Sequence, residues 1–187
     1  MRVIAGEFRG LKLNSPKNRD IRPTTDRIKE DVFNILAPYL SGSRFLDLFS
    51  GSGAMAVEAV SRGCMNATMI EGDRSSIDLI RSNIEKTKSP QRFCVIHSDV
   101  IKFLQHTDQS YDVIYIDPPY RLQIIEKVFE IIRKRDIITD NGVVVLEQGT
   151  ENEQSDQIGD FKIFRKKKYS STIVYFLRRS SESGEER

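Results

Sequence analysis

The chain has 187 residues, of which 39% are hydrophobic and 30% are charged, and its formal net charge is +2. This length and composition are typical of one globular domain with a single core. The sequence has no apolar run near the about 20 residues that a membrane helix needs, and no apolar stretch of a secretory signal near its start. We therefore expect a cytoplasmic protein that does not enter a membrane.

The first 24 residues are predicted to form a basic hairpin and a loop. Short apolar runs at 3–6 and 10–13 favour two strands turned around residues 7–9, and residues 14–23 read as loop. Thr25 or Asp26 can cap the helix that follows, whose apolar side chains recur at helical spacing until Pro38 and Gly42. We treat this hairpin and loop as an extension that precedes the main domain, residues 25–178.

Apolar strands alternate with helices through the rest of that domain. The predicted strands are 45–49, 67–71, 93–96, 111–116 and 143–147, and the predicted helices are 53–62, 74–87, 100–106 and 122–135. This alternation predicts an α/β fold with a mostly parallel sheet covered by helices on both faces. Residues 161–178 are expected to add an antiparallel hairpin at the sheet edge, and the polar residues 179–187 to form a disordered tail.

The cysteines and histidines predict neither a disulfide nor a metal site. Cys64 and Cys94 are isolated, without a CxxC pair, and only His97 and His106 could supply nitrogen ligands. We expect both cysteines to be small core residues.

A glycine-rich turn follows the first strand of the sheet. Gly51, Gly53 and Ala56 match the spacing of the dinucleotide-binding fingerprint, and Glu71 lies 18 residues beyond Gly53, where an acid can accept from ribose hydroxyls. The turn predicts a nucleotide-like ligand at the N-terminus of a helix. NAD remains a competitor at this point, as does a purely structural role in packing.

The most informative stretch is Asp117-Pro118-Pro119-Tyr120, directly after a predicted buried strand. Two consecutive prolines take the backbone out of the sheet in an extended shape and leave carbonyls without intrachain partners. A carboxylate before them and an aromatic ring after them offer acceptors for an exocyclic amine and a face on which a base can stack. The alternative is a rigid turn with an exposed tyrosine.

The glycine turn and the proline loop are informative together. In an open α/β sheet both lie at the carboxyl ends of strands, along one crevice. A nicotinamide enzyme has no use for the proline loop, whereas transfer of a methyl group from S-adenosylmethionine to a base amine needs both sites. The pairing therefore favours a methyltransferase.

These motifs, in this order, resemble the class I S-adenosylmethionine-dependent methyltransferases that modify exocyclic amines. The N-terminal motifs narrow the resemblance: Arg2-Val3-Ile4-Ala5-Gly6, Phe8-Arg9-Gly10 and Ile21-Arg22-Pro23-Thr24-Thr25-Asp26-Arg27 are similar to those of the bacterial 16S ribosomal RNA guanine-N2 methyltransferases, the RsmD-type family. The resemblance runs from about residue 2 to 178. It implies a Rossmann-like methyltransferase fold, S-adenosylmethionine as cofactor, and 16S rRNA or the small ribosomal subunit as substrate.

The resemblance also implies roles for single residues. The cofactor-binding set is Asp47, Phe49, Ser50, Gly51, Gly53, Glu71 and Asp99. In it, Asp47 and the glycine turn hold the methionine part, Glu71 binds the ribose, and Asp99 approaches the adenine amino group. Asp99 has the competing role of capping the next helix.

The catalytic set is the proline loop. We expect the Asp117 carboxylate and the Pro118 carbonyl to accept the two N–H bonds of the amine, with Pro119 shaping the loop and Tyr120 stacking on the base. Whether Asp117 also takes the released proton stays open. The base must leave its stack to enter the loop.

The charge is unevenly distributed along the chain. Residues 1–30 hold eight basic and four acidic side chains, residues 161–179 hold seven basic and none acidic, and residues 31–160 hold 13 basic and 20 acidic. Basic ends on an acidic body predict contacts with a nucleic-acid backbone. The candidates are Phe8, Arg9, Lys12, Arg22, Arg27, Lys29, Arg165, Lys166, Lys167 and Lys168, with Phe8 as a stacking residue. An alternative role of Arg22 and Arg27 is to anchor the N-terminal segment to the acidic core. The alternative for the lysine run is a solvated edge strand without a function.

Several functions remain as alternatives. An adenine-N6 DNA methyltransferase shares the proline-loop chemistry, but 187 residues leave no extra domain to read a DNA sequence. A protein amide methyltransferase is disfavoured by Asp117 where that class has asparagine. A noncatalytic RNA-binding module is the third alternative. His97, His106 and Glu147 receive no role, and the protein is expected to be a monomer.

Overall fold

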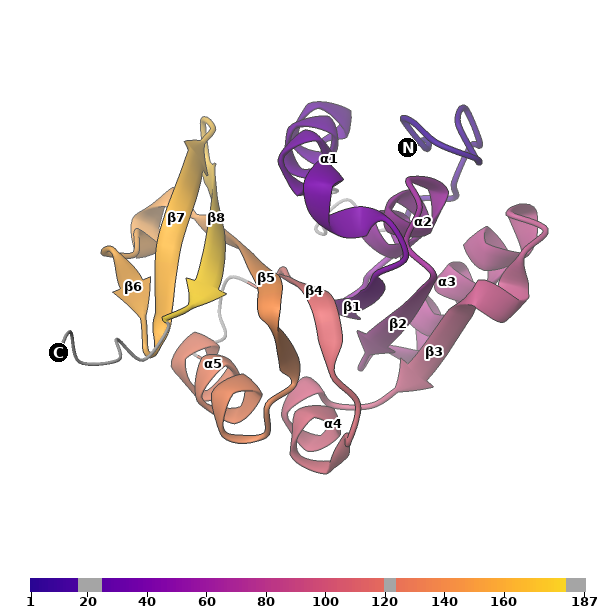
Figure 1. The fold of residues 1–187 in the computed structure, drawn as a ribbon. Helices are drawn as coiled ribbons and strands as arrows, with labels where there is room; N and C mark the ends of the chain where they lie inside the picture. The colour runs from indigo at the N-terminus through magenta and orange to yellow at the C-terminus, as the bar shows by residue number, and fades with distance from the viewer. Residues whose placement is uncertain (17–24, 120–123, 181–187) are drawn as a thin grey trace, which may run out of the picture.

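One eight-stranded sheet organises the protein (Figure 1), and its order is β3-β2-β1-β4-β5-β8-β7-β6. The computed structural model describes residues 1–16, 25–119 and 124–180. The strands are β1 (Arg44–Leu48), β2 (Asn66–Glu71), β3 (Phe93–His97), β4 (Tyr111–Ile116), β5 (Ile138–Gly149), β6 (Gln157–Ile158), β7 (Phe161–Lys168) and β8 (Thr172–Arg179). Strands β1 to β5 pair in parallel, and β8 joins β5 in antiparallel. The predicted Rossmann-like methyltransferase fold is confirmed.

Helices cover both faces of the sheet. They are α1 (Asp26–Leu40), α2 (Ala54–Ser61), α3 (Arg74–Lys86), α4 (Val100–His106) and α5 (Ile125–Lys134), with short 3-10 turns at Pro90–Arg92 and Thr150–Asn152. The buried side chains of α1, α2 and α3 share one core cluster with one face of the sheet, and those of α4 and α5 share a second cluster with the other face. Figure 1 shows α1 and α2 on the opposite side of the sheet from α4 and α5.

Three boundaries differ from the predicted ones. Pro38 lies within α1, which continues to Leu40, because the ring is exposed and removes only one hydrogen bond near the helix end. Strand β5 begins at Ile138, since this residue pairs with Tyr111 before the apolar run that the sequence showed. The short strand β6 pairs with the start of β7 and was not predicted.

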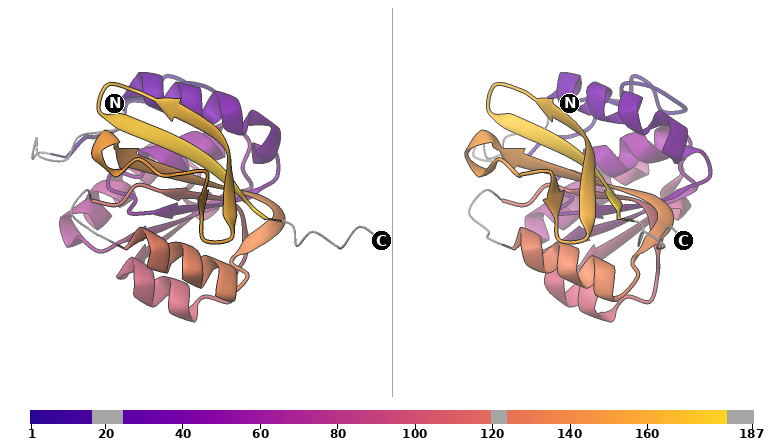
Figure 2. Two further views of the ribbon diagram at one scale, coloured as in Figure 1. Left: turned by 90° about the vertical axis from the view of Figure 1, so that its left-hand side faces the viewer. Right: turned by 60° about the vertical axis from the view of Figure 1, so that its left-hand side comes forward.

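The antiparallel hairpin of β7 and β8 is confirmed, and it lies alongside α1 (Figure 2). The Tyr169 hydroxyl, at the hairpin tip, donates a 2.9 Å hydrogen bond to Asp31 of α1. Near the other end the Arg178 guanidinium donates to the Tyr39 hydroxyl and stacks over the Tyr39 ring, 5.2 Å from its centroid. The hairpin is therefore attached to the helix at both of its ends.

The first two residues of the predicted disordered tail, 179–187, have defined contacts in the structure. Arg179 belongs to β8, where it pairs with Phe161 and forms a 2.9 Å ion pair with Asp136. The Ser180 amide donates to the carbonyl of Asp160 at 2.7 Å. Residues 181–187 lie outside the described residues.

The N-terminal segment packs onto α2, and its two predicted strands pair only over a short stretch, where the amides of Val3 and Leu13 donate to the carbonyls of Leu11 and Met1 at 2.9 and 3.1 Å. An isolated antiparallel bridge joins Arg2 and Lys12. The amides of Ile4 and Ala5 donate to Glu58 of α2, at 2.8 and 3.1 Å, and these donors are therefore not paired with a partner strand. Side chains of this segment share the core cluster with α1 and α2, so the segment and the main domain have a common core.

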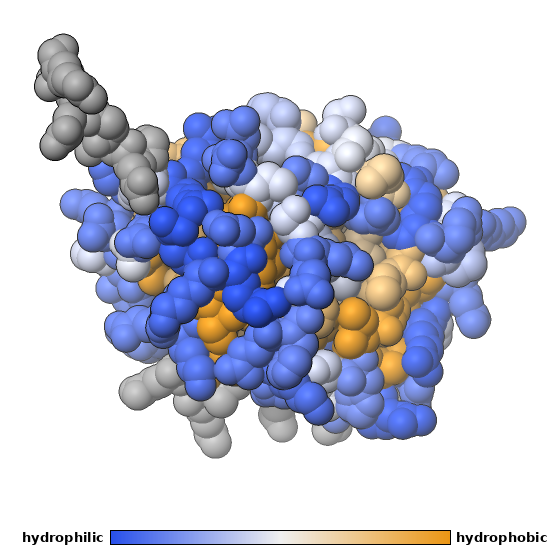
Figure 3. All heavy atoms as spheres, turned by 60° about the horizontal axis from the view of Figure 1, so that its bottom comes forward, coloured by the Kyte–Doolittle hydropathy of each residue, from blue (hydrophilic) through white to orange (hydrophobic). Residues whose placement is uncertain are grey.

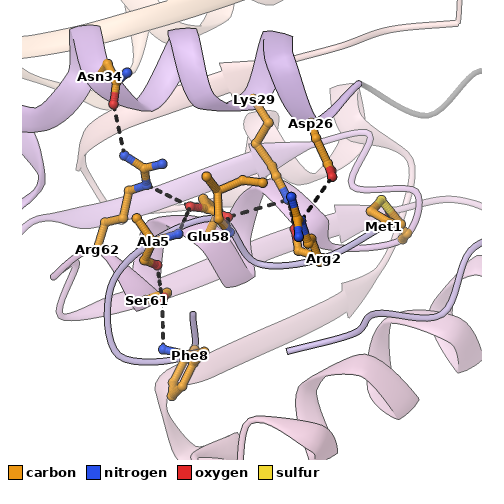
Figure 4. Close-up of polar contacts among 12 residues, drawn as sticks. Met1, Arg2, Ala5, Phe8, Asp26, Lys29, Asn34, Glu58, Ser61 and Arg62 are labelled. Carbon is orange, nitrogen blue, oxygen red and sulfur yellow. Dashed lines mark hydrogen bonds and ion pairs between the residues drawn. The ribbon is translucent and has the colours of Figure 1, made fainter. Parts of the chain in front are cut away.

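Glu58 is the centre of a buried polar network (Figure 4). Besides the two amides it contacts Arg62 at 2.7 Å and the Lys29 ammonium at 3.5 Å, and Lys29 also donates to the carbonyl of Arg2. Glu58 and Lys29 are at most 1% exposed. Every one of these contacts joins a donor to an acceptor, so the network ties the N-terminal segment to α1 and α2.

The surface is largely polar. Figure 3 shows hydrophilic side chains over most of the α4 and α5 side, with hydrophobic ones between them. Within residues 1–16, 25–119 and 124–180 no helix is long and apolar enough to span a membrane. Cys64 is buried as expected, but Cys94 is exposed, because it lies on the edge strand β3.

Candidate active site

Polar side chains lie at the carboxyl ends of the central strands, and those of β1, β4 and β5 lie on the face covered by α1 and α2. Asp47 pairs in register with Tyr115, and Tyr115 pairs with Val145. Side chains two residues apart on a strand share a face. Glu147 therefore follows Val145 on the same face as Asp47, and Asp117 comes directly after the end of β4, two residues beyond Tyr115.

The glycine turn after β1 leads into α2. Gly51 and Gly53 have positive φ angles of 54° and 75°, and Gly53 stands at the N-cap of α2. A Cβ atom on Gly53 would lie 3.2 Å from Met69 and 3.4 Å from Ile80, so the turn packs closely on β2 and α3. Phe49 also has a positive φ, of 65°, which is uncommon for a residue with a side chain. The turn is thus held in a shape that brings backbone toward the crevice.

Glu71 holds the glycine turn directly. One carboxylate oxygen accepts from the amide of Gly51 at 2.8 Å, and the other accepts from the amide of Asp73 at 2.9 Å. Each carboxylate oxygen can accept a second hydrogen bond. Glu71 therefore orients the turn and still has acceptor capacity toward a ligand.

Asp47 is a buried acid with an unpaired oxygen. It is 1% exposed, and its Oδ2 atom has no hydrogen-bond partner among the described residues. Burial, the largest cause, and the nearby Glu71 carboxylate raise its pKa to about 8, although hydrogen bonds from Ala56 and Ser50 oppose the shift. A buried carboxyl group of this kind is suited to accept from a cationic or N–H donor of a ligand.

Asp117 stands at the start of the proline loop, and the pKa of its carboxyl group is strongly raised. Burial, then the Glu147 and Asp47 carboxylates, raise its pKa well above the ordinary value. Pro118 is buried and Pro119 is exposed. Tyr120, predicted to stack on the base, lies outside the described residues.

The Glu147 carboxylate lies near enough to Asp117 to raise its pKa, which the sequence alone did not reveal. Glu147 is 5% exposed, and the buried Tyr115 hydroxyl donates a hydrogen bond to it. The available signal was a charged residue directly after the apolar run Val143–Leu146. Only the pairing of β4 with β5 brings that residue beside Asp117.

Proteins of known family and structure are similar to this chain. A family model described as "Conserved hypothetical protein 95" matches residues 1–178. The chain is 31% identical over 185 residues to the ribosomal RNA small subunit methyltransferase D of Escherichia coli strain K12, across 99% of this chain and 92% of that protein. It belongs to the RsmD family of methyltransferases.

Other relatives agree with this membership. The putative rRNA methyltransferase YlbH of Bacillus subtilis is 33% identical over 177 residues, 93% of this chain and 96% of that protein. The solved structure of the putative methyltransferase yhhF from Escherichia coli, at 30% identity, matches with a TM-score of 0.87 over 97% of this chain and 99% of that one. The methyltransferase of Podospora anserina, solved with bound S-adenosylhomocysteine, shares the fold at 11% identity and a TM-score of 0.70.

S-adenosylmethionine is the cofactor of this RsmD-family chain, and the crevice fits it. The unpaired oxygen of Asp47 suits the ammonium of the methionine part, and the glycine turn offers amides at a helix N-terminus. Ser50, whose hydroxyl donates to the Asp47 carbonyl at 2.8 Å, holds the start of that turn. The described residues include no group of three or more histidine, cysteine, aspartate or glutamate side chains suited to a metal ion.

Asp99 caps α4 in the structure, as the alternative interpretation proposed. Its carboxylate accepts from the amide of Lys102 at 2.9 Å, and the residue is exposed beyond the end of β3. The preceding Ser98 donates from its amide to the carbonyl of Glu71 at 3.0 Å. Asp99 thus lies at the strand end next to Glu71, and a contact with the adenine amino group stays a prediction.

The predictions that Lys29 and Phe8 contact RNA are wrong. Lys29 is 1% exposed and paired with Glu58, and burial lowers its pKa despite that partner. It lies on the apolar face of α1, one turn before Phe33. Phe8 is 9% exposed and packs in the core, with its amide donating to the Ser61 hydroxyl at 2.9 Å. Neither side chain is available to an RNA.

The other basic candidates that the structure describes are at least partly accessible. Arg9, Lys12, Arg27 and Arg165 are exposed, and Lys167 is half-buried. Lys166 and Lys168 are exposed but form ion pairs with Glu153. Arg22 lies outside the described residues. The open part of β7 therefore keeps a basic surface, although part of its charge is neutralised by Glu153.

Proposed function

We propose that this protein methylates the exocyclic N2 amine of a guanine in 16S ribosomal RNA of the small subunit, acting as a monomer. The observation that carries the proposal is the acceptor group formed by Asp117 and the proline loop beside the glycine turn and Asp47. Relatives that are 31–33% identical over most of the chain carry the names of rRNA methyltransferases. Together they support a base amine of rRNA as the acceptor of the methyl group.

The residues of the chain orient and deprotonate the amine. The lone pair of a guanine amine is delocalised into the ring, so the amine is a poor nucleophile. Acceptance of its two N–H bonds by the Asp117 carboxylate and the Pro118 carbonyl turns the lone pair toward the donor. S-adenosylmethionine supplies the methyl group as part of a sulfonium. The raised pKa of Asp117 suits it to take the proton that the amine loses.

The basic surfaces support an RNA substrate. Arg9 and Lys12 on the N-terminal segment, Arg27 at the start of α1, and Arg165 and Lys167 on β7 are the remaining candidates for phosphate contacts. Helix α1, which carries Arg27, lies between the N-terminal segment and the hairpin of β7 and β8. An RNA held across these elements would present a flipped base to the proline loop.

Transfer of a labelled methyl group tests the proposal. Unmethylated small ribosomal subunits, naked 16S rRNA and duplex DNA are incubated with labelled S-adenosylmethionine, and the nucleosides are then separated. We expect N2-methylguanosine from the ribosomal RNA and no label in DNA. Preferential formation of N6-methyladenine in DNA would contradict the proposal and favour the DNA methyltransferase alternative.

A further inference from the structure

An exposed aromatic ring lies on the basic strand β7. Among the described residues two large hydrophobic side chains are exposed, Met65 at 54% and Phe164 at 43%. The pairing of β7 with β8 shifts register between Ile163 and Arg165, so Phe164 stands at a bulge. A bulge leaves one residue without a partner across the ladder and re-aims its side chain. A defined feature of the strand therefore presents Phe164 at the surface.

The Phe164 ring is ordered by an arginine and a second aromatic ring. The guanidinium carbon of Arg178 lies 4.7 Å from the centroid of the Phe164 ring and 5.2 Å from that of Tyr39. The Phe164 ring also packs at a tilt against buried Phe176, with 6.3 Å between the centroids. These contacts hold the orientation of a ring that keeps much of its surface open to solvent.

Basic side chains surround Phe164 on the same face of the hairpin. In the antiparallel pairing, Lys162, Arg165 and Lys167 lie opposite Arg178, Phe176 and Val174. Residues opposite each other share a face of the sheet, and Phe176 and Val174 belong to the core cluster that contains α1. Four cations therefore lie with Phe164 on the face of the hairpin that α1 covers in part.

The charge on this face is not neutralised by Glu153. Lys166 and Lys168, which Glu153 pairs with, lie opposite Tyr175 and Ile173, and those two residues belong to the core cluster on the other face. Within the part of the chain that the structure describes, Lys162, Arg165 and Lys167 form no ion pair. The α1 face of the hairpin thus combines positive charge with an exposed ring.

This combination is typical of surfaces that bind unpaired nucleotides. Such surfaces hold the backbone with basic side chains and stack bases on aromatic rings or on arginine planes. We propose that Phe164 stacks on an unpaired base of the ribosomal RNA substrate, while Lys162, Arg165 and Lys167 contact the phosphates beside it. The inference rests on the proposed function and deepens it, because it adds a second base contact outside the crevice. Arg178 is then the residue that positions the ring.

A single tryptophan tests whether RNA stacks at this position. The sequence contains no tryptophan, so Phe164→Trp gives one indole reporter on β7. Short single-stranded RNA is titrated into this variant at low salt, where phosphate contacts are strongest. We expect the fluorescence to be quenched by the single strand and much less by a duplex of the same sequence, whose bases are already stacked.

Met65→Trp is the matched control for this titration. Met65 is also exposed, but it lies directly before β2, in the other half of the sheet from β7. Its indole should keep its fluorescence when the RNA is added. Equal quenching of the two variants, or no quenching of Phe164→Trp, overturns the inference.

Phe164→Leu separates stacking from packing in the reaction itself. Leucine keeps an apolar contact with Phe176 but removes the ring. We expect KM for the ribosomal RNA substrate to rise by about 5-fold to 10²-fold with kcat nearly unchanged, because the stack forms in the ground state and the transition state alike. Phe164→Tyr keeps the ring and should return KM to that of the wild type. A wild-type KM in Phe164→Leu overturns the inference.

Failure of the inference differs from failure of the proposed function. If the wild-type enzyme forms no N2-methylguanosine in ribosomal RNA, both are overturned. If it forms N2-methylguanosine while Phe164→Leu keeps the wild-type KM or Phe164→Trp is not quenched, only the role of Phe164 is overturned. If Phe164→Leu does not fold, the titration of Phe164→Trp decides alone.

Discussion

The molecule contains two groups of buried charged residues with opposite character. In the network around Glu58, a carboxylate meets Lys29, Arg62 and two backbone amides. In the crevice, Asp47 and Asp117 approach each other with Glu147, and one oxygen of Asp47 has no partner among the described residues. Matched charges hold the N-terminal segment in place, whereas in the crevice the carboxylates of Glu147 and Asp47 raise the pKa of Asp117. Burial alone therefore does not distinguish these two groups of charged residues. The signs of the neighbouring charges do.

The largest effect on stability is expected from the matched network. Glu58→Ala leaves the Lys29 ammonium buried without its carboxylate and removes the acceptor of two amides. We expect the free energy of unfolding to fall by about 3–5 kcal/mol. Urea denaturation measures it, with Glu130→Ala as control, since its ion pair with Lys134 is exposed and should contribute less than about 1 kcal/mol. Equal losses in the two variants would show that the comparison is wrong.

A substitution in the crevice should lower activity without lowering stability. Asp117→Ala is expected to lower kcat/KM for methyl transfer by about 10²–10⁴-fold, because the amine loses its acceptor. Its unfolding free energy should stay the same or rise at pH 8, because an acid with a raised pKa is removed. Asp108→Ala is the control, since this carboxylate is 94% exposed before the same strand. A large loss of stability in Asp117→Ala would place Asp117 with the structural group.

A pH-dependent effect is expected at Asp47, and over one pH unit it is smaller than the loss expected for Glu58→Ala. Its pKa in the folded protein is about 8, raised first by burial, whereas an unfolded aspartate titrates near pH 4. The stability linked to this proton is complete below about pH 4 and is lost as pH rises toward 8, by about 1.4 kcal/mol per pH unit. The difference in unfolding free energy between wild type and Asp47→Asn, measured by urea denaturation at several pH values, should follow this slope. A difference independent of pH would contradict the raised pKa.

Local patterns predicted most of the fold. The alternation of apolar strands and helices placed the five parallel strands and the helices between them, because each element shows its own period. The glycine turn and the proline loop were visible because glycine and proline restrict the backbone in known ways. The errors arose where a residue's role depends on a distant partner. From the sequence, Lys29 is expected to be a surface charge. In the structure it is buried and paired with Glu58, 29 residues later in the chain.

The same reason explains why the site was only partly predicted. Asp47, Asp117 and the glycine turn stand beside local signals in the sequence. Glu147 does not, since its place beside Asp117 depends on the pairing of β4 with β5 across a helix. Phe8 was misplaced in the opposite direction, because a loop that packs against α2 looks in sequence like an exposed hairpin tip.

The attachment of the β7–β8 hairpin to α1 bears on which RNA substrates the protein can accept. Tyr169 and Arg178 fasten the hairpin at two points, to Asp31 and Tyr39. The basic side chains of β7 and the carboxylates of the crevice thus belong to one sheet, whose edge hairpin is held to α1. If the proposed phosphate contacts on β7 form, a bound RNA has to span the interval between β7 and the crevice to deliver a base, and this limits the shapes of RNA that can be methylated.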